Sequence, residues 1–324
     1  MMRHRTFSLI SKIIALGIAL ILLFLAAKTL LWGVRFVRDA KLDSSDGHTN
    51  ILIMGIGGGD HEGADLTDTI MVLSLDPVKK TVALISIPRD IWSDTLKDKV
   101  NTAYHYGELK KKGGGLLLAK VTMEDVIGIP IQYAVVVDFS GFTKVIDAVG
   151  GIDVNVPEAF TDTQYPKPGM EQSACPGDPT NACVYETVHF DAGLQHMDGA
   201  RALIYARSRH AEGNEGNDFA RSRRQQIIIV ALKDRFTHPA AWATLSRLQA
   251  LPRLLDDATD MDMTVVQAFM VGRLFASTSQ DQIKKIAFDQ LLDTPPAYLY
   301  NNLYVLVPHT SWDDIHAYIK EQLQ

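Results

Sequence analysis

The sequence predicts an α/β protein in which helices pack on a sheet, preceded by one membrane-spanning helix. Apolar, strand-like runs alternate with helix-like segments along most of the chain, and this order is typical of the α/β class. A long apolar run stands near the N-terminus. A hydrophobic content of 47% and a charged content of 22% are ordinary for a folded protein, and 324 residues suffice for one large domain or two small ones.

The N-terminal apolar run continues without interruption from Ile13 to Ala27. With the apolar residues beyond Lys28, it is long enough for a helix of about 20 residues that spans a bilayer. Basic residues before the run favour a cytoplasmic N-terminus, although Lys28 and Arg35 follow it. A cleaved signal peptide is the alternative, but no clear small-x-small cleavage site follows the run. We therefore expect a single-pass protein of the cell membrane with four parts: a cytoplasmic N-terminus (1–12), an anchor (13–34), a polar juxtamembrane linker (35–49) and an extracytoplasmic domain (50–324).

The first half of the predicted domain is rich in strands. It begins with a buried strand, Asn50-Ile-Leu-Ile-Met-Gly. A hairpin follows, with strands at Thr69–Asp76 and Thr81–Ile87 joined across Asp76-Pro-Val-Lys-Lys. The next predicted elements are a helix at Gly114–Ile127, a strand at Gln132–Asp138, a helix at Phe139–Val149 and a strand at Ile152–Val156.

The second half is predicted to be mostly helical, after a long loop at about Pro157–Thr187. Cys175 and Cys183 both lie in this loop, where they could close a short disulfide in an oxidising exterior or remain two unpaired thiols. The predicted elements that follow are helices at Asp198–Arg207 and Asp218–Phe236, further helical segments to Ala276, a strand at Leu303–Val307 and a helix after Ser311.

The charge distribution indicates an anionic ligand. The whole chain has a formal net charge of −6 and a pI near 5.9, which argues against a nucleic-acid partner. Between Arg201 and Arg235, however, eight Lys/Arg stand against four Asp/Glu, a local charge of +4. Guanidinium groups are well shaped to hold phosphate oxygens in pairs.

The helix predicted at Asp218–Phe236 favours a binding site over a solvated surface. Residues three and four apart share a helix face, so Asp218, Arg221, Arg224 and Gln225 form one stripe, from which Arg223 points away. The same helix continues as Ile227–Leu232, which is apolar nearly all round and must be buried. A charged stripe that runs into a buried end is costly unless the charges are paired or bind a ligand.

Three further segments carry polar residues beside predicted strands. The glycine-rich loop Gly57–Thr69 contains Asp60, Asp65 and Asp68, whose oxygens could bind a divalent cation, although a plain flexible loop is the alternative. Arg89-Asp90 ends a strand, where ligands often bind in α/β sheets, but the pair could equally be a surface ion pair. Lys99 and Asn101 could contact phosphate or sugar, or belong to a polar loop.

Taken in order, these motifs resemble the LytR-CpsA-Psr family over about residues 50–233, with a helical C-terminal part at 234–324. The motifs are Asp68-Thr69, Pro88-Arg89-Asp90, Lys99-x-Asn101-x-Ala103-Tyr104, Asp138-Phe-x-Gly141-Phe, Gly150-Gly151-Ile, Arg207-x-Arg209 and Asp218-x-x-Arg221-x-x-Arg224-Gln225-Gln226. The resemblance implies an α/β/α sandwich with a mixed central sheet that binds a polyprenyl (pyro)phosphate-linked glycan. It also implies Mg²⁺-dependent transfer of that glycopolymer, as a phosphodiester, onto peptidoglycan.

The resemblance also implies roles for individual residues. Asp68 would bind Mg²⁺, with Asp65 or Asp60 as a second ligand. Arginines would grip the pyrophosphate, and two acids would orient them, one of which could accept the proton of the attacking hydroxyl. The expected catalytic residues are Arg89, Asp90, Arg207, Arg209 and Asp218. The expected pyrophosphate-binding residues are Lys99, Asn101, Arg221, Arg224 and Gln225. Ile227–Leu232 could line a groove for the isoprenoid tail, with ordinary core packing as the alternative.

Two departures from the family pattern leave other functions open. Leu66 stands where the family commonly has an arginine, which His61 could replace, and Gly57 stands where an aspartate is common. A polyprenyl-pyrophosphate hydrolase would use the same site with water as the nucleophile. A non-catalytic lipid-phosphate-binding or regulatory protein is the alternative from another class. Its regulatory form is disfavoured by the expected export of the domain and by the lack of a basic DNA-binding module.

Overall fold

A computed structural model of the 324-residue chain describes residues 41–59, 63–167, 170, 175–178, 180, 182–238 and 259–324. The chain divides into two compact units, Met1–Leu42 and Asp43–Gln324, and the elements below belong to the second. The predicted anchor at 13–34, the segment 1–12 and Asp60 lie outside the described residues. Within the described ranges, no helix has the length and apolar character needed to cross a bilayer.

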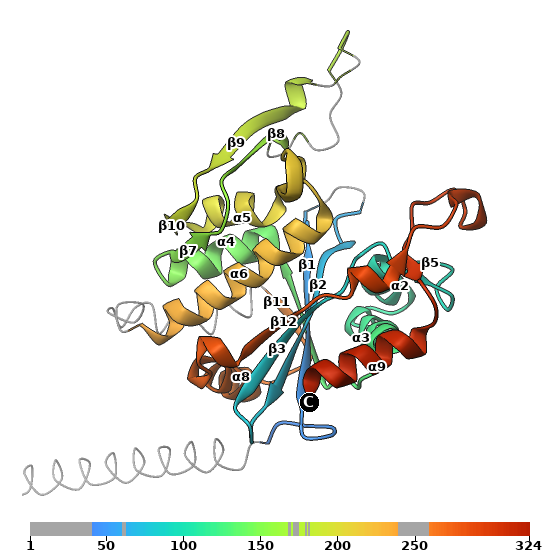
Figure 1. The fold of residues 1–324 in the computed structure, drawn as a ribbon, viewed down its shortest axis with the longest axis vertical. Coiled ribbons are helices and arrows are strands. Elements are labelled where there is room, and N and C mark those ends of the chain that lie inside the picture. The colour runs from blue at the N-terminus through green and yellow to red at the C-terminus, as the bar shows by residue number, and fades with distance from the viewer. Residues whose placement is uncertain are drawn as a thin grey trace, which may run out of the picture. The chain divides into compact units, whose positions relative to one another are not determined.

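A mixed sheet of six strands forms the centre of the domain, in the order β11-β6-β1-β2-β3-β12 (Figure 1). Its strands are β1 (Thr49–Ile56), β2 (Thr67–Asp76), β3 (Thr81–Ser86), β6 (Tyr133–Asp138), β11 (Thr259–Met261) and β12 (Ile283–Ile286). β1 runs parallel to β6, and β3 runs parallel to β12, whereas the other neighbours are antiparallel. The predicted hairpin is confirmed: the Asp76 side chain accepts hydrogen bonds from the backbone N–H groups of Val78 and Lys79, each at 2.9 Å, and this closes the turn.

Seven α-helices lie within the described ranges. They are α2 (Ala103–Lys110), α3 (Gly115–Ile127), α4 (Phe139–Ala148), α5 (Gly199–Arg207), α6 (Asp218–Thr237), α8 (Val265–Ser277) and α9 (Trp312–Leu323). Figure 1 shows α2, α3 and α9 on one side of the sheet and α4, α5 and α6 on the other. The predicted helices at 114–127, 139–149, 198–207, 218–236 and after 311 are confirmed, and only α2 lacked a prediction. Side-chain caps explain several helix starts: Asp138, Asp198, Asn217 and Ser311 each accept a backbone N–H of the first turn.

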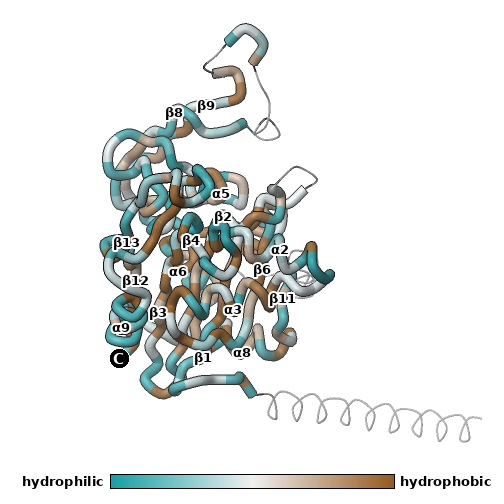
Figure 2. Tube along the Cα trace, turned by 90° about the vertical axis from the view of Figure 1, so that its right-hand side faces the viewer, coloured by the Kyte–Doolittle hydropathy of each residue, from teal (hydrophilic) through white to brown (hydrophobic). Residues whose placement is uncertain are grey.

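The first face of the sheet packs into a continuous core with α3 and α9. Successive strand residues point to opposite faces, and Leu52, Val72 and Ile85 on this face are fully buried against the apolar sides of both helices. Ala119 of α3 and Ile319 of α9 are likewise inaccessible to solvent. In Figure 2, the hydrophobic stretches lie mainly in the central strands and inner helices, and most outer turns are hydrophilic.

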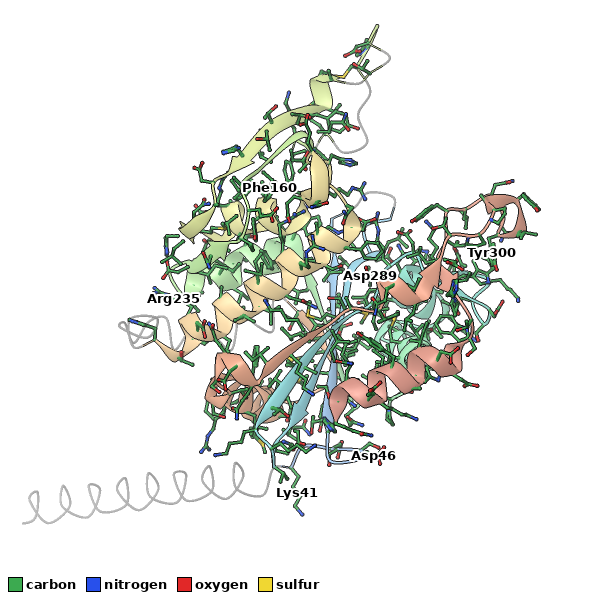
Figure 3. The ribbon with its side chains drawn as sticks, in the orientation of Figure 1. Lys41, Asp46, Phe160, Arg235, Asp289 and Tyr300 are labelled. Atoms are coloured by element: carbon green, nitrogen blue, oxygen red, sulfur yellow. A yellow bond between two sulfur atoms is a disulfide. The ribbon has the colours of Figure 1, made fainter. Side chains whose placement is uncertain are left out.

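A second core joins α4, α5 and α6 to two small antiparallel sheets. β7 (Ile152–Val156) pairs with β10 (Gly193–Met197), and β8 (Phe160–Pro166) pairs with β9 (Tyr185–Phe190). Phe160, marked in Figure 3, stacks on Phe190 with ring centroids 5.1 Å apart. The predicted loop at 157–187 is therefore wrong at both ends. Each of these two strands has only a few apolar residues among polar ones, so an alternating pattern is hard to see in the sequence. The two strands also lie on opposite sides of the Cys175–Cys183 segment, so neither is next to its pairing partner along the chain.

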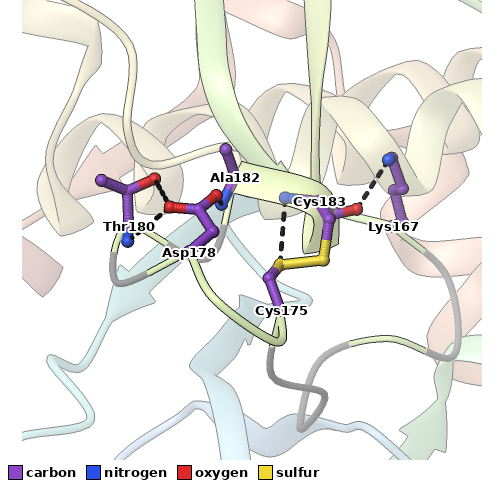
Figure 4. Close-up of a disulfide and its surroundings, with 6 residues drawn as sticks. All are labelled: Lys167, Cys175, Asp178, Thr180, Ala182 and Cys183. Carbon is purple, nitrogen blue, oxygen red and sulfur yellow. Dashed lines mark hydrogen bonds between the residues drawn. A yellow bond between two sulfur atoms is a disulfide. The ribbon is translucent and has the colours of Figure 1, made fainter.

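Cys175 and Cys183 form a disulfide, which agrees with the first of the two alternatives left open (Figure 4). The turn between them is held by Asp178, whose carboxylate accepts the backbone N–H groups of Thr180 and Ala182 at 2.8 and 3.0 Å. Lys167 Nζ donates to the Cys183 carbonyl at 2.7 Å and so links the turn to the end of β8.

The tail contains less strand than predicted. Asn301 and Asn302 adopt positive φ angles, and the chain stays irregular up to Val305. Leu306 then bridges to Ile91, and only Val307–Pro308 (β14) forms a strand, antiparallel to β13 (Leu292–Asp293). The strand predicted at Leu303–Val307 is therefore mostly wrong, because a turn of two asparagines directly before it redirects the backbone. The remaining short strands, β4 (Trp92–Ser93) and β5 (Asp98–Lys99), form a hairpin that carries Lys99.

Candidate functional site

A cavity of about 370 Å³ lies on the second face of the sheet, against α4, α5 and α6. We call it the large cavity. Most of its wall is apolar, contributed by residues of β1, β2 and β6 and by residues of the three helices. The apolar lining includes Ile53, Met71, Val135, Val137, Phe142, Val145, Leu203, Ile228, Ile229 and Leu232. Part of the apolar run of α6 therefore borders the cavity, and Ile228 also belongs to the second core.

Polar side chains from separate segments of the sequence also line the large cavity. They are Asp68, Arg89, Asp138, Asp162, Arg207, Arg209, His210, Arg221 and Gln225. Four of the five predicted pyrophosphate-gripping arginines are among them, brought by the segment after β3, the end of α5 and the first turn of α6. The cavity thus combines an apolar body with a cationic lining region.

Arg89 is held by acidic neighbours. Its Nη1 donates a hydrogen bond to Asp68 Oδ1, and its Nε lies 3.5 Å from Asp90 Oδ2. Burial tends to lower the pKa of this guanidinium, but the negative charges of Asp68, Asp218 and Asp90 outweigh burial and raise the pKa above its ordinary value. Arg89 therefore remains a fixed positive charge in the lining.

Arg221 is more deeply buried and less well paired. It is 6% exposed, and its Nη2 lies 3.1 Å from Asp218 Oδ1 and 3.4 Å from the Asp68 carbonyl oxygen, to which it donates. Burial lowers the pKa of Arg221 to about 10, and the positive charges of Arg89 and Arg209 act in the same direction. Its Nε makes no hydrogen bond. A buried cation with unused donors is expected where an anion binds.

The segment after α5 places Arg207 and Arg209. The Arg207 guanidinium lies 4.2 Å from the centroid of the Phe139 ring, and its Nη1 donates to the Tyr165 hydroxyl at 3.4 Å. The backbone N–H of Arg209 donates to Asp162 Oδ2 at 3.1 Å. Asp162 was missed in the sequence because it lies on β8, inside the stretch interpreted as a loop, where a single aspartate carries no signal.

Arg224 has a different environment from the one expected. It is 1% exposed and is not among the residues that line the large cavity. Its Nε donates to the Tyr205 carbonyl at 3.1 Å, its Nη2 donates to the Ser208 carbonyl, and its Nη1 pairs with Glu215. The geometry does not favour the expected contact of Arg224 with pyrophosphate, since its nitrogens bind protein groups that tie α6 to the end of α5. Arg223 lines neither cavity, and its side chain is 55% exposed, in agreement with the prediction that it lies outside the site.

A second, smaller cavity of about 170 Å³ shares part of the same wall. We call it the small cavity. Asp68, Arg89, Arg221 and Gln225 line both cavities, and we call these four residues the shared wall. The lining of the small cavity also includes Asp90, Asn217, Asp218, Ser222, Tyr304 and Leu306. The two predicted catalytic carboxylates, Asp90 and Asp218, thus border the small cavity, and neither borders the large one.

Lys99 and Asn101 border neither cavity. Lys99 Nζ lies 2.7 Å from Asp90 Oδ1, so it neutralises that carboxylate. Asn101 is buried, and its carbonyl oxygen accepts the Thr67 hydroxyl at 3.1 Å. The geometry thus favours a supporting role for Lys99, through Asp90, over direct contact with phosphate.

Asp68 is the predicted metal ligand that the fold brings to the cavities. Its side chain is 44% exposed on the shared wall, and one oxygen accepts Arg89 while the other remains a candidate ligand. Asp65 instead pairs with His105 Nδ1 at 2.7 Å and lines neither cavity. In the part of the chain that is described, no three His, Cys, Asp or Glu residues cluster as a metal site. Mg²⁺ commonly uses one or two carboxylates together with substrate phosphates and water, so Asp68 beside an anion site fits this ion.

The glycine-rich loop before Asp68 has a packing function. Gly58 has a φ of +70°, and a Cβ at this position would lie 2.8 Å from Asp138 Cβ. Asp138 also begins α4, because its carboxylate accepts the Gly141 N–H at 2.6 Å. Glycine is required at residue 58 by this close approach, so this part of the loop is shaped by packing against the start of α4.

Comparison with known proteins supports the motif-based assignment. The LytR_cpsA_psr family profile matches residues 33–321. The polyisoprenyl-teichoic acid–peptidoglycan teichoic acid transferase TagV of Bacillus subtilis (strain 168) is 28% identical over 296 residues, which cover 89% of this chain and 68% of TagV. TagU of Bacillus mycoides (strain KBAB4), with the same activity in its name, is 30% identical over 202 residues, 60% of this chain and 55% of TagU.

The fold agrees with the sequence comparison. The crystal structure of B. subtilis TagV superposes with a TM-score of 0.59 at 26% identity, covering 86% of this chain and 98% of the crystallised one. The family profile covers well over half of the sequence, and the arginine motifs lie inside the match. The chain belongs to the LytR-CpsA-Psr family.

Proposed function

We propose that this chain transfers a glycopolymer from a polyprenyl-pyrophosphate carrier onto peptidoglycan, forming a phosphodiester. One observation carries the proposal: the large cavity has an apolar body and a lining region with four arginines. A polyprenyl pyrophosphate has the complementary construction, a long hydrocarbon tail with a compact anionic head. The names of TagV and TagU support the teichoic acid class of donor and peptidoglycan as the acceptor.

The cavity would bind each end of the donor by a different force. The tail would bury apolar surface against β1, β6 and α6, a gain of roughly 25 cal/mol per Å². Arg89, Arg207, Arg209 and Arg221 would hold the phosphate oxygens by charge-assisted hydrogen bonds. Gln225, whose Nε2 lies 3.4 Å from the Ala206 carbonyl, would add a neutral donor.

The proposed reaction is an attack by an acceptor hydroxyl on the phosphorus that carries the glycan. A new O–P bond forms as the bridging P–O bond breaks, and polyprenyl monophosphate leaves with the electron pair. The arginines stabilise the charge that develops on the phosphoryl and leaving oxygens. The proton of the hydroxyl passes to a carboxylate, so atoms and charge balance.

We propose Asp218 as that proton acceptor. Both oxygens of Asp90 already have cationic neighbours, Lys99 Nζ at 2.7 Å and Arg89 Nε at 3.5 Å. Asp218 Oδ1 is near Arg221 but makes no hydrogen bond, and its side chain is 43% exposed. Asp90 would then orient Arg89 and Lys99, which is the other role considered for these acids.

We propose Mg²⁺ as the cofactor, held by Asp68, with Asp60 or Asp65 as further candidates. When bound, the ion would add electrostatic stabilisation to the phosphoryl oxygens. Arg89, which donates a hydrogen bond to Asp68, would hold that carboxylate in place within the shared wall. Asp65 is the weaker candidate, because it is paired with His105.

We also propose that residues 13–34 anchor the chain in the cell membrane, with the domain on the extracytoplasmic side. The Cys175–Cys183 disulfide supports this side, since such bonds persist in oxidising compartments. An anchored enzyme suits a donor and a lipid product that both remain in the bilayer.

The test is reconstitution of the transfer. The full chain, purified in detergent, is incubated with a polyprenyl-pyrophosphate glycan, peptidoglycan fragments and Mg²⁺, and the phosphodiester product is measured. We expect transfer that is lost with EDTA, restored by Mg²⁺, and reduced about 10²–10³-fold by Asp68→Asn. Asp94→Asn is the matched control, because Asp94 pairs with Lys97 on the surface and its side chain is 79% exposed.

Two outcomes would contradict transfer. Release of polyprenyl monophosphate without coupling to peptidoglycan would identify the chain as a hydrolase. Donor binding without turnover, unaffected by Asp68→Asn, would indicate a non-catalytic binding protein.

A further inference from the structure

We propose that the small cavity, with Tyr304 at its edge, is the acceptor subsite that binds one sugar of the glycan strand. The inference rests on the proposed transfer reaction but concerns a different part of the molecule. The small cavity has under half the volume of the large one and suits a single saccharide unit, with the rest of the strand outside.

The first argument is the position of the two cavities relative to the shared wall. Arg89 and Arg221 line both cavities, so a phosphate held by them in the large cavity is next to whatever occupies the small one. Arg207 and Arg209 border the large cavity alone. In phosphoryl transfer, the attacking and leaving oxygens lie roughly in line through phosphorus. A second cavity on the same arginines therefore offers a separate approach for the nucleophile.

The second argument is the set of unused polar atoms. Among the described residues, seven buried side-chain nitrogen or oxygen atoms have no hydrogen-bond partner. Three of these are Arg89 Nε, Asp218 Oδ1 and Arg221 Nε, and all three residues line the small cavity. Arg89 Nε and Asp218 Oδ1 each have an ionic neighbour, at 3.5 and 3.1 Å, whereas Arg221 Nε has neither a hydrogen bond nor an ion pair. Arg221 is more than nine-tenths buried. Buried polar atoms normally make hydrogen bonds, so the unpaired Arg221 Nε, beside a donor and an acceptor that have only ionic neighbours, favours a hydroxylated ligand at this place.

The third argument is the aromatic ring beside these polar groups. Tyr304 lines the small cavity and is 56% exposed. Lys99 Nζ, which pairs with Asp90, lies 6.0 Å from the centroid of its ring. An aromatic face next to hydrogen-bonding groups can hold a sugar, whose C–H face packs on the ring while its hydroxyls reach the polar groups.

The backbone keeps Tyr304 in this position. Leu306 N donates to the Asp90 carbonyl, and Trp92 N donates to the Leu306 carbonyl, each at 2.9 Å, so the segment is joined to the strand end that carries Arg89. Earlier in the same loop, Tyr300 (Figure 3) packs edge-on against Trp92 with ring centroids 5.1 Å apart. The loop is thus held on both sides of Tyr304, which keeps the exposed ring at the small cavity.

The experiment compares Tyr304→Ala, Tyr304→Phe and Tyr298→Ala in the full chain, with an undecorated, soluble peptidoglycan glycan as acceptor. Tyr298 is the matched control, because it lies in the same loop, is 74% exposed and lines neither cavity. We expect Tyr304→Ala to raise the acceptor KM about tenfold, Tyr304→Phe to change it less than twofold, and Tyr298→Ala to leave it unchanged. The donor KM is expected to stay constant in all three variants.

A second variant tests the same subsite independently, in case Tyr304→Ala does not fold. Ser222, on the first turns of α6, lines the small cavity alone, so Ser222→Phe should fill it and produce the same acceptor-specific rise in KM. Thermal unfolding of each variant checks that the fold is intact.

Calorimetric titration of the same glycan without donor separates this inference from the proposed function. If transfer occurs and neither variant alters the acceptor KM or the glycan affinity, the subsite is wrong and the transferase proposal stands. If the glycan binds in a Tyr304-dependent way but no transfer occurs, the subsite stands and the transferase proposal fails. Equal increases in donor and acceptor KM would overturn the subsite by indicating damage to the shared wall.

Discussion

The two faces of the central sheet are built from the same strands but have different interiors. On one face, Leu52, Val72 and Ile85 pack without exposure against α3 and α9. On the other, Ile53 and Met71, their neighbours in sequence, line a cavity of about 370 Å³. Both faces are apolar, so hydropathy alone does not distinguish a packed core from a binding cavity. The way in which the helices pack on each face decides between them.

Arg221 and Arg224 repeat this contrast on one helix. They lie three residues apart on α6, and both are buried. Arg224 donates to the Tyr205 and Ser208 carbonyls and pairs with Glu215, whereas Arg221 lines both cavities with Nε unpaired. One arginine is therefore part of the protein's own hydrogen-bond network, and the other is available to a ligand.

The largest expected effect separates these two arginines. We expect Arg221→Met to lower transfer about 10²–10³-fold with little loss of stability, because it removes a poorly paired buried cation. Arg224→Met should instead destabilise the fold by about 3–5 kcal/mol, because it leaves the Glu215 carboxylate and three backbone carbonyls without their donor. Steady-state transfer and urea unfolding of both variants measure the two effects. Similar stability losses in both would show that Arg221 is structural as well.

The next prediction compares neighbouring residues on opposite faces of β1. Leu52→Ala should cost about 2–5 kcal/mol, because the deleted methyl groups leave a void in a packed core. Ile53→Ala should cost less, since Ile53 already borders a cavity and loses fewer contacts. Urea unfolding with the m-value monitored gives both costs. Equal costs for the two variants would mean that the second face is packed as tightly as the first.

The smallest expected effect concerns the length of the lipid. Val145→Phe adds bulk to the apolar lining of the large cavity, and we expect about a tenfold loss of affinity for long-chain polyprenyl donors. Short-chain analogues should bind as before, since their heads reach the same arginines. Val121→Phe on α3 is the control, because Val121 is 46% exposed and outside the cavity. A loss that is independent of chain length would place the tail elsewhere.

Local signals made much of the fold predictable. The hairpin after β2 follows from Asp76 and the turn behind it, and α6 follows from the cap at Asn217 and its long apolar continuation. The β8–β9 pair was missed because each strand is short and its partner lies beyond the disulfide-bonded turn. The tail strand was overestimated because Asn301 and Asn302 turn the chain directly before it.

The site was only partly predictable for a related reason. Charge reversal and spacing single out Arg207, Arg209 and Arg221, and the position at a strand end singles out Arg89. The fold brings all four to one cavity. Spacing along α6 could not separate Arg221 from Arg224, since residues three apart share a face. Asp162 and Tyr304 carry no sequence signal because each matters only through its distant neighbours.

The sequence by itself determined the alternation of strands and helices, the family and the concentration of arginines, because these depend on residue type and spacing along the chain. The tertiary structure alone decided which arginine is free to bind, which acids border the small cavity, and that the second face of the sheet is hollow. Those properties depend on contacts between segments far apart in the sequence, such as Arg221 with Asp68 and Leu306 with Asp90. The conformational preferences of single residues and short segments do not specify contacts between distant segments, which are set by the packing of the whole fold.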